Sequence, residues 1–342
     1  MHVRRLVLFC KFVFFMKQVV KQFDKNFSMA GLGLQVGIPK IKVVGVGGSG
    51  SNTVTRIMNS AVLGVELVAL NTDAQALNFC KAQKKVLIGK AVTKGLGAGM
   101  DDSVGRAAAE ESKKEIAEIL KGSDMVFVTC GLGGGTGTGV APIVCELARS
   151  LRILTIAVVT TPFSFEGQQR SLVAKRGMEN LKDKVDSLLV IKNDNLLKIV
   201  DEKTTVANAF EVCDDILKHA VIGITDLILA PAIINLDFAS IASVIKNSGY
   251  SLFGMGMAEG KNRAIDAANK AISSPLLDFS IKGAKGILFN VAGNDTTLNE
   301  IKEIGKFITQ NADPKVKILF GATKDKTLKK GEIKVTVIAT KF

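Results

Sequence analysis

The sequence predicts an α/β protein: a doubly wound parallel-sheet domain, a long central helix, and a smaller α+β C-terminal domain. Short apolar runs alternate with helical patterns from Ile41 to Ile191, which is the rhythm of βαβ units. One helical pattern then continues from about Thr205 to Leu229, and strands and helices mix after it. The chain has 342 residues, which is enough for two domains with sizeable cores.

Residues 1–36 are expected to be an N-terminal extension, a helix that packs on the domain or lies at its surface. Basic residues interrupt an apolar run there, and no acid precedes Asp24. Lys11 breaks the apolar core that a secretory signal requires. An amphipathic basic helix on an anionic membrane, an organelle transit peptide, and a true start at Met16 or Met29 stay open as alternatives.

Residues 37–204 are expected to form the parallel-sheet domain. Its strands are predicted from short apolar, β-branched runs. These runs are Ile41–Val46, Val65–Leu70, Met125–Cys130, Ile153–Thr160 and Ser187–Ile191. A helix is expected from Val140 to Leu151, with Pro142 near its start.

The central helix is predicted over residues 205–230, because apolar residues recur there at steps of three and four and Ala230-Pro231 ends the pattern. Residues 231–342 are expected to form the smaller domain, which begins with glycine-rich turns. Its later elements are helices near Asn262–Ser273 and Leu298–Gln310, and strands at Gly286–Val291, Lys317–Gly321 and Ile333–Thr340.

Composition narrows the classes of function. The net charge is +13, but the lysines are scattered and no basic motif with interleaved aromatics occurs, so no specific nucleic-acid binding is expected. The five cysteines lack metal-ligand spacing and indicate a reducing compartment rather than a disulfide scaffold. His2 and His219 cannot form a catalytic cluster. No apolar run is long enough to predict a membrane-spanning helix.

The stretch from Gly131 to Gly139, Gly-Leu-Gly-Gly-Gly-Thr-Gly-Thr-Gly, says most about chemistry. It lies between a predicted buried strand and a predicted helix. Glycines let the backbone approach a phosphate closely, and the N–H groups of a helix N-terminus point at the charge. The loop contains no Lys, so it is not the G-x-x-x-x-G-K-[ST] phosphate loop.

A second glycine loop runs from Gly45 to Gly50, directly after the first strand. It fits the dinucleotide pattern G-x-G-x-x-G, with Glu66 and Asp73 as candidate ribose acids, so an NAD-dependent oxidoreductase is one hypothesis. Two glycine loops at the carboxyl ends of neighbouring parallel strands, however, favour one triphosphate.

These loops resemble those of the tubulin and FtsZ superfamily of self-assembling GTPases. The resemblance runs from Ile41 to Thr340 and is closer to FtsZ, the prokaryotic division family, whose archaeal members carry an N-terminal helical extension. Three further blocks are similar to FtsZ nearly word for word: Asn71–Leu77, Lys94–Gly99 and Ile272–Leu277. A self-assembling GTPase of the division ring is therefore expected, located in the cytoplasm at the division site.

The resemblance implies a site for GTP or GDP, with Mg²⁺ bound through the phosphates and no metal ligand from protein side chains. It places the phosphates on the first loop, through Gly48, Ser49, Gly50, Ser51 and Asn52, and on the second, through Gly135, Thr136, Gly137 and Thr138. It gives Ala98 and Gly99 the sensing of the γ-phosphate and places the ribose near Glu166 and Arg170. It assigns guanine to Asn193, Phe210 and Asp214.

Catalysis is expected at a subunit boundary. The family's loop after the central helix, here Asn235 to Ser240, enters the next subunit's nucleotide site, where Asp237 would orient the attacking water. Ser240 stands where the family has a second Asp, so a GTP-binding structural protein with weak hydrolysis is an alternative. The family's usual tether-binding peptide is expected to be absent after Phe342, and a truncated sequence stays open as the alternative. The head-to-tail contact makes the chain itself the expected partner, as a homopolymer, and division-ring or tether proteins stay open.

Overall fold

The computed structural model describes residues 37–60, 64–198, 201, 203–229, 232–234, 236–274, 281–310, 312–325 and 327–342. The predicted helical extension, residues 1–36, lies outside these residues. Pro39–Phe342 form one compact unit. The finer division at residues 204 and 230 remains a prediction.

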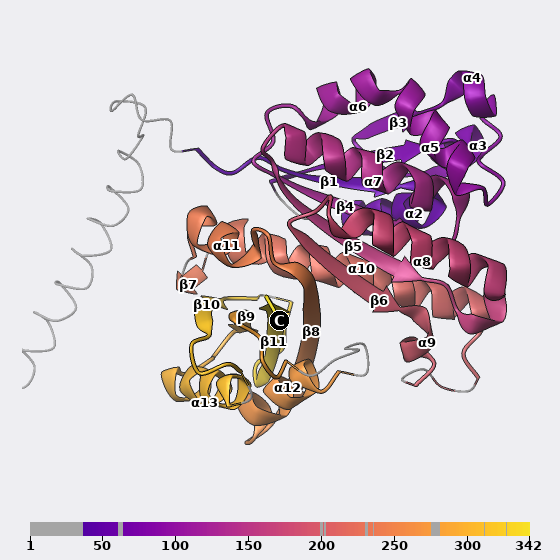
Figure 1. Ribbon diagram of the computed structural model, residues 1–342. Coiled ribbons are helices and arrows are strands. Elements are labelled where there is room, and N and C mark those ends of the chain that lie inside the picture. Colours follow the sequence, from indigo (N-terminus) through magenta and orange to yellow (C-terminus); the bar gives the residue numbers. More distant parts are fainter. Residues whose placement is uncertain are drawn as a thin grey trace, which may run out of the picture. The chain divides into compact units, whose positions relative to one another are not determined.

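A parallel sheet forms the first half of this unit, as the alternating pattern predicts (Figure 1). Its strand order is β3-β2-β1-β4-β5-β6. The strands are β1 (Ile41–Val46), β2 (Val65–Asn71), β3 (Lys84–Leu87), β4 (Met125–Gly131), β5 (Leu154–Thr161) and β6 (Ser187–Lys192). Five of the six were expected within one residue at each end; β3, a short edge strand with two exposed lysines, was not expected.

Helices cover both faces of the sheet, which confirms the doubly wound class. Side chains of α6, α7 and α8 build the apolar core on one face, and those of α2 and α10 build it on the other. The helices are α2 (Gly47–Asn59), α3 (Ala74–Phe79), α4 (Lys90–Thr93), α5 (Asp102–Glu111), α6 (Lys113–Leu120), α7 (Gly135–Ser150), α8 (Gln168–Lys182) and α9 (Asn193–Leu196), with a 3₁₀ turn η2 (Ser164–Glu166).

Helix α7 corrects one expectation, because it begins at Gly135 rather than Val140 and Pro142 lies inside it. The glycines in the first turns of α7 let α5 pack closely against this helix. A Cβ on Gly139 would lie 2.3 Å from the carbonyl oxygen of Asp102, and one on Gly105 of α5 would lie 2.2 Å from that of Gly135. Here glycine serves close helix packing as well as phosphate access.

The central helix α10 (Val206–Leu229) has nearly the predicted bounds. Its apolar stripe, which includes Leu217, Val221 and Ile224, is buried against the sheet. Asp214 is buried on the same helix with 7% of its surface exposed. A buried carboxylate is costly, so this residue indicates a polar function at that end of α10.

The sheet continues beyond β6 through β8, since Ser187 of β6 pairs in parallel with Gly249. The order there is β8-β11-β9-β10-β7, and its mixed pairing confirms the α+β character. The elements are β7 (Ala232–Ile234), α11 (Phe238–Ile245), β8 (Gly249–Glu259), α12 (Arg263–Ile272), β9 (Gly286–Gly293), α13 (Leu298–Thr309), β10 (Lys317–Thr323) and β11 (Glu332–Thr340).

The prediction of glycine-rich turns after the central helix was wrong, because β8 is an eleven-residue strand. Gly256 lies in that strand where α12 crosses it. A Cβ there would lie 2.1 Å from the carbonyl oxygen of Ala267. A glycine inside a strand therefore marks a close backbone approach here rather than a turn.

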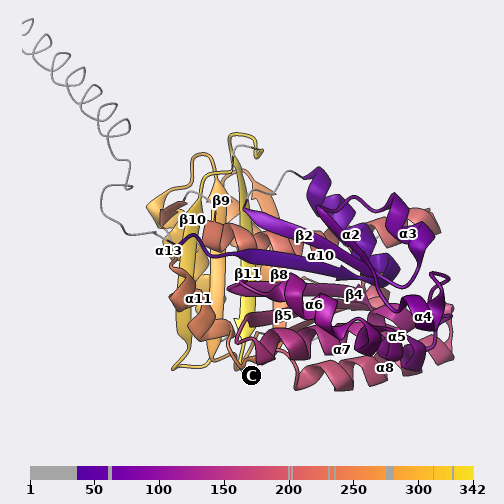
Figure 2. The same cartoon turned by 90° about the horizontal axis from the view of Figure 1, so that it is seen from above.

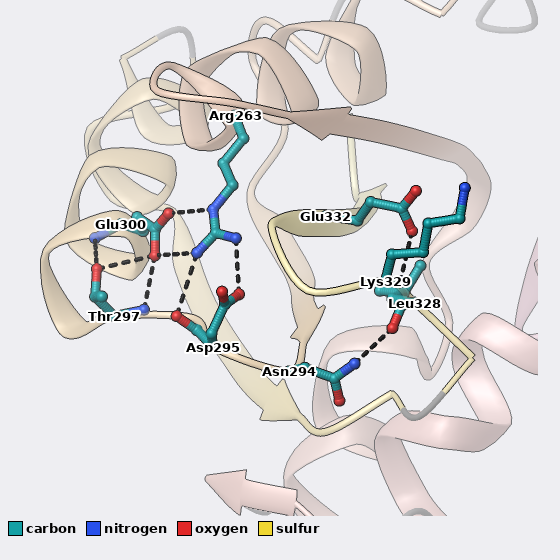
Figure 3. Close-up of polar contacts among 8 residues, drawn as sticks. All are labelled: Arg263, Asn294, Asp295, Thr297, Glu300, Leu328, Lys329 and Glu332. Atoms are coloured by element: carbon teal, nitrogen blue, oxygen red, sulfur yellow. Dashed lines mark hydrogen bonds and ion pairs between the residues drawn. The ribbon is translucent and has the colours of Figure 1, made fainter.

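A partly buried ion-pair network joins the two helices of this second half (Figure 3). Arg263 at the start of α12 donates to Asp295 at 2.7 Å and to Glu300 at 2.6 Å. Glu300 also accepts from the backbone N–H of Thr297 at 2.7 Å and completes the capping box of α13.

Among the described residues, no helix combines the length and apolar character needed to cross a membrane.

Candidate nucleotide-binding site

The carboxyl ends of β1 and β4 lie where a crevice is expected in a sheet of this order. The chain leaves β1 toward β2 on one side and leaves β4 toward β5 on the other, so the two loops separate between these neighbouring strands. Open α/β sheets bind ligands at such a point. A cavity of about 560 Å³ lies there, lined by Val46 at the end of β1 and Gly131 at the end of β4.

Two helices begin at this cavity without side-chain caps. The residues before α2 and α7 are Val46 and Gly134, and neither gives a capping hydrogen bond. The first N–H groups of a helix need an acceptor, and the helix dipole favours an anion there. A Cβ added to Gly48 or Gly134 would meet no atom within 4 Å, so both glycines face open space in the cavity. Phosphate oxygens fit this pair of helix ends.

Other glycines hold the loops tightly together. A Cβ on Gly137 would lie 2.4 Å from the carbonyl oxygen of Gly131, and one on Gly50 would lie 2.4 Å from that of Thr129. Both distances are far below van der Waals contact. Only glycine therefore lets α2 and α7 start so close to the sheet.

A pair of hydroxyl groups connects the second glycine loop to Thr72, the residue that follows β2. The Oγ1 atoms of Thr72 and Thr136 are 2.6 Å apart. The carbonyl oxygen of Thr72 accepts from the backbone N–H of Gly97 at 3.1 Å. Ala98 and Gly99 follow and line the cavity. Thr72 therefore connects Thr136 of the phosphate loop to the loop that contains Ala98 and Gly99, the residues predicted to sense the γ-phosphate.

The turn after β5 brings an ion pair to the cavity. Arg170 of α8 donates to Glu166 of η2, which also accepts from the backbone N–H of Phe163 at 2.9 Å. The Nε–H of Arg170 is buried without a partner. A buried unpaired donor is costly unless a ligand accepts from it. Arg170 lines the cavity, so a ribose or phosphate oxygen of a ligand is a candidate acceptor for this group.

The cavity is also lined by Asn193 of α9 and by Phe210 and Asp214 of α10. The Oδ1 atom of Asn193 is buried without a hydrogen-bond partner. Phe210 packs edge-on against the buried Phe163, with 5.3 Å between ring centroids. Burial raises the pKa of Asp214 to about 6, and Arg56 opposes that rise. A flat base with N–H donors fits this aromatic and acceptor-lined part of the cavity.

Most of the predicted nucleotide residues meet in this one cavity. Those that line it are Gly48, Ser49, Asn52, Ala98, Gly99, Gly135, Thr136, Gly137, Glu166, Arg170, Asn193, Phe210 and Asp214.

Three predicted residues do not line the cavity. Gly50 packs against β4, and Ser51 is buried inside α2 with 2% of its surface exposed. The hydroxyl of Thr138 accepts from the backbone N–H of Gly133 at 2.9 Å, so it shapes the loop from behind. The motif resemblance marks whole loops, whereas helical geometry turns only some of their residues toward the cavity.

Sequence reasoning missed some residues of the lining. Asn71 and Thr160 lie at the carboxyl ends of β2 and β5, and Leu96 and Met100 lie on the rim with exposed side chains. Asp73, considered only as a ribose acid for a dinucleotide, also lines the cavity and caps α3. Asn71 and Thr160 could have been predicted, because the carboxyl ends of parallel strands meet at one edge of the sheet.

The predicted catalytic residues lie elsewhere. Asp237 is the N-cap of α11, and Ser240 lies in its first turn. Neither lines the cavity. Asp214 and Leu229 are fifteen residues apart on α10, about 22 Å at 1.5 Å per residue, and α11 follows beyond Leu229. Both views show α11 and helix α3, whose Ala76 lines the cavity, at opposite ends of the compact unit (Figures 1 and 2).

Known proteins share this fold. The family model of the tubulin/FtsZ GTPase domain matches residues 40–201, and that of the FtsZ C-terminal domain matches residues 249–342. An empty FtsZ dimer from M. jannaschii is 45% identical over 90% of this chain and 89% of that chain, with a TM-score of 0.86. This chain belongs to the FtsZ family. A mutant FtsZ of M. jannaschii is 42% identical over 95% of this chain and 94% of that chain, with a TM-score of 0.85.

The FtsZ family assignment makes the chain a GTPase of the tubulin/FtsZ type. It favours that class over an NAD-dependent oxidoreductase for the loop at Gly45–Gly50. CetZ1 from Haloferax volcanii, a GDP-bound monomer, is 22% identical over 89% of this chain and 94% of that chain, with a TM-score of 0.75. At this identity the likeness shows a shared fold.

Proposed function

We propose that this FtsZ-family protein binds GTP in the cavity and assembles into head-to-tail filaments that hydrolyse it at the subunit interface. The observation that carries the proposal is the polarity of the cavity. Two uncapped helix N-termini lie at one end, and a buried carboxylate, Asp214, lies at the other. A guanine nucleotide has phosphates for the first end and N–H donors for the second.

The phosphates would be bound by backbone N–H groups at the starts of α2 and α7, with Gly48 and Gly134 leaving room for them. Thr136 adds a hydroxyl, which Thr72 orients through their shared hydrogen bond. Mg²⁺, bound with the phosphates, would neutralise charge as the γ-phosphate leaves.

Base selection rests on Asp214. Guanine presents N1–H and N2–H donors, which a carboxylate accepts, whereas adenine would leave the buried carboxylate unpaired. The unpaired Oδ1 of Asn193 offers a further acceptor to the base. GTP is therefore expected to bind at least tenfold more tightly than ATP, because a charged hydrogen bond contributes about 1.5–3 kcal/mol.

Hydrolysis is assigned to a second subunit. Within one subunit, Asp237 is exposed and lies far along α10 from the cavity. In a head-to-tail contact the α11 end of one copy meets the cavity end of the next, and Asp237 would then orient the attacking water. Such a contact does not close on itself and propagates a filament. The division ring in the cytoplasm is the proposed location of that filament.

Ser240 favours a second candidate, a GTP-binding filament protein with slow turnover. A serine lacks the negative charge of the family's second carboxylate and holds a cation or water less strongly. Phosphate release by the assembled protein distinguishes the two candidates.

Calorimetric binding of GTP, GDP, ATP and ADP to the purified full chain tests the site, and sedimentation with GTP or GDP tests assembly. We expect guanine selectivity and GTP-dependent pelleting. Equal affinity for guanine and adenine nucleotides would contradict the base assignment. Binding without pelleting would leave the site intact and refute the filament.

A further inference from the structure

Arg56 is a charged side chain that links the two ends of the proposed nucleotide site. It lies in the last turn of α2, the helix whose first residues face the phosphate end of the cavity. Helix α2 packs against α10, and the Nε atom of Arg56 is 3.6 Å from Oδ2 of Asp214. This is the ion pair that Asp214 makes within the described part of the chain. Arg56 does not line the cavity itself.

The surroundings of Asp214 are otherwise acidic. Glu211 and Asp215 lie beside it on α10, three positions before it and one after, and both reduce the tendency of Asp214 to ionise. Arg56 contacts these acids as well, at 3.4 Å from Glu211 and 3.8 Å from Asp215. Lys218 pairs with Asp215 at 2.8 Å.

Across the cavity, Glu166 and Arg170 pair with each other, so they add little net charge at Asp214. Arg56 is therefore the cation that faces the Asp214 carboxylate directly.

We propose that Arg56 is a positioning residue for guanine recognition, which keeps Asp214 ionised and its carboxylate oriented to accept both donors of the base. The inference rests on the proposed GTP site. A protonated Asp214 would present an O–H donor against guanine N1–H, so it would lose the bidentate contact. The Nε atom of Arg56 lies 3.6 Å from Oδ2, which is within ion-pair range, so its charge favours the ionised carboxylate and attracts Oδ2 toward α2.

A purely structural ion pair between α2 and α10 predicts a different result. It would lower affinity for every nucleotide equally and at every pH, because both ends of the site would move together. A positioning role predicts a loss that is greatest for bases with both donors and that grows as the pH falls. Inosine nucleotides, which lack the 2-amino donor, separate the two roles.

The test measures GDP, IDP and ADP binding by calorimetry between pH 6 and pH 8.5, using nucleotides that are not hydrolysed. Arg56→Gln should weaken GDP about tenfold at pH 7, reduce the GDP-to-IDP ratio, and shift the acid midpoint of GDP binding to higher pH. At pH 8.5 the loss should shrink. Arg56→Lys should recover most of the affinity. Lys218→Gln, which removes a cation from the same acidic cluster, should stay within about twofold.

Melting curves check that each variant folds. Should Arg56→Gln be unstable, the neutral pair Arg56→Gln with Asp214→Asn is compared with Asp214→Asn alone, and the two should bind GDP and IDP alike. Wild-type protein that does not prefer GDP to ADP overturns the proposed site and this inference with it. Wild-type selectivity, combined with a loss in Arg56→Gln that is equal for GDP and IDP at all pH values, overturns the inference alone.

Discussion

The carboxylate of Asp237 accepts a hydrogen bond from the backbone N–H of Ser240 at 2.5 Å. Asp237 is therefore the N-cap of α11, and hydrogen bonds from Ser240 lower its pKa, which keeps it ionised at neutral pH. By the motif resemblance, the same two residues are proposed to occupy the positions of the family's paired acids. One is a carboxylate held in place, and the other is neutral.

Restoring the second acid should accelerate hydrolysis. Ser240→Asp places another carboxylate in the first turn of α11, where it can help to hold the water or a cation. We expect turnover by assembled protein to rise several-fold and filaments to shorten in lifetime, while GDP affinity of the monomer is unchanged. Ser243→Asp is the matched control, because it adds the same charge later on α11. Unchanged turnover with intact assembly would contradict the assigned role of this position.

Guanine binding should weaken in acid. The pKa of Asp214 is about 6, so its carboxylate becomes protonated as the pH falls through 6. Affinity for GDP should therefore decrease from pH 7.5 to pH 5 more in the wild type than in Asp214→Asn. Titration of the nucleotide phosphate is common to both proteins and cancels in the difference. Calorimetry over this range measures it; equal pH dependence in the two proteins would contradict ionised Asp214 as the base reader.

Without nucleotide, the same carboxylate should destabilise the fold. Its pKa is raised from 3.8 to about 6, so the protonated form favours folding. The cost of the carboxylate is fully present above pH 6 and absent below 3.8; the shift corresponds to about 3 kcal/mol. Asp214→Asn should raise the free energy of unfolding by about 1–3 kcal/mol at pH 7.5, and the gain should shrink toward pH 4.

Denaturant unfolding measures that gain. Asp215→Asn is the control, because its side chain is 41% exposed and little change is expected. A destabilised Asp214→Asn would show that the ion pair with Arg56 outweighs burial.

Alanine at two glycine positions of the second loop should change different properties: stability at Gly137 and nucleotide affinity at Gly134. Gly137→Ala would push a methyl group to 2.4 Å from the carbonyl oxygen of Gly131, so stability should fall by several kcal/mol. A Cβ on Gly134 meets nothing within 4 Å but lies at the cavity, so Gly134→Ala should keep its stability and lose nucleotide affinity. Melting temperature and GDP binding, measured on both variants, separate packing from phosphate access.

The network around Arg263 should stabilise the second half of the protein. Arg263 is buried and pairs with Asp295 and Glu300, so Arg263→Gln leaves two acids without their cation. Hydrogen bonds between charged groups contribute about 1.5–3 kcal/mol, and solvent screens the exposed Asp295, so denaturant unfolding should show a loss of about 1–2 kcal/mol. Lys302→Gln on the exposed face of α13 should change stability little. GDP affinity should be retained in both variants, since neither residue lines the cavity.

Periodicity and strand composition were sufficient to predict the parallel sheet and α10, because buried β-branched runs and a three-and-four apolar repeat each determine one element. They failed at α7 and β8. There Gly139 and Gly256 occupy regular elements because another helix crosses closely. Glycine marks either a turn or a close approach, and only the tertiary partner distinguishes them.

The motif resemblance brought most of the cavity together but could not tell which side of a helical turn faces the ligand, as Ser51 and Thr138 show. Arg56 carries no motif of its own. Its role appears only when α2 is packed against α10.

The central claim is that one GTPase site is shared by two subunits, and mixing two inactive variants tests it most directly. Asp237→Ala keeps an intact cavity but lacks the residue supplied to a neighbour, and Arg170→Ala has the reverse defect. Turnover per subunit of the wild type should rise with protein concentration across the assembly threshold. A mixture of the two variants should recover part of the activity that each lacks alone. If wild-type turnover stays flat with concentration and the mixture stays as inactive as its components, each subunit hydrolyses GTP by itself and the shared site is wrong.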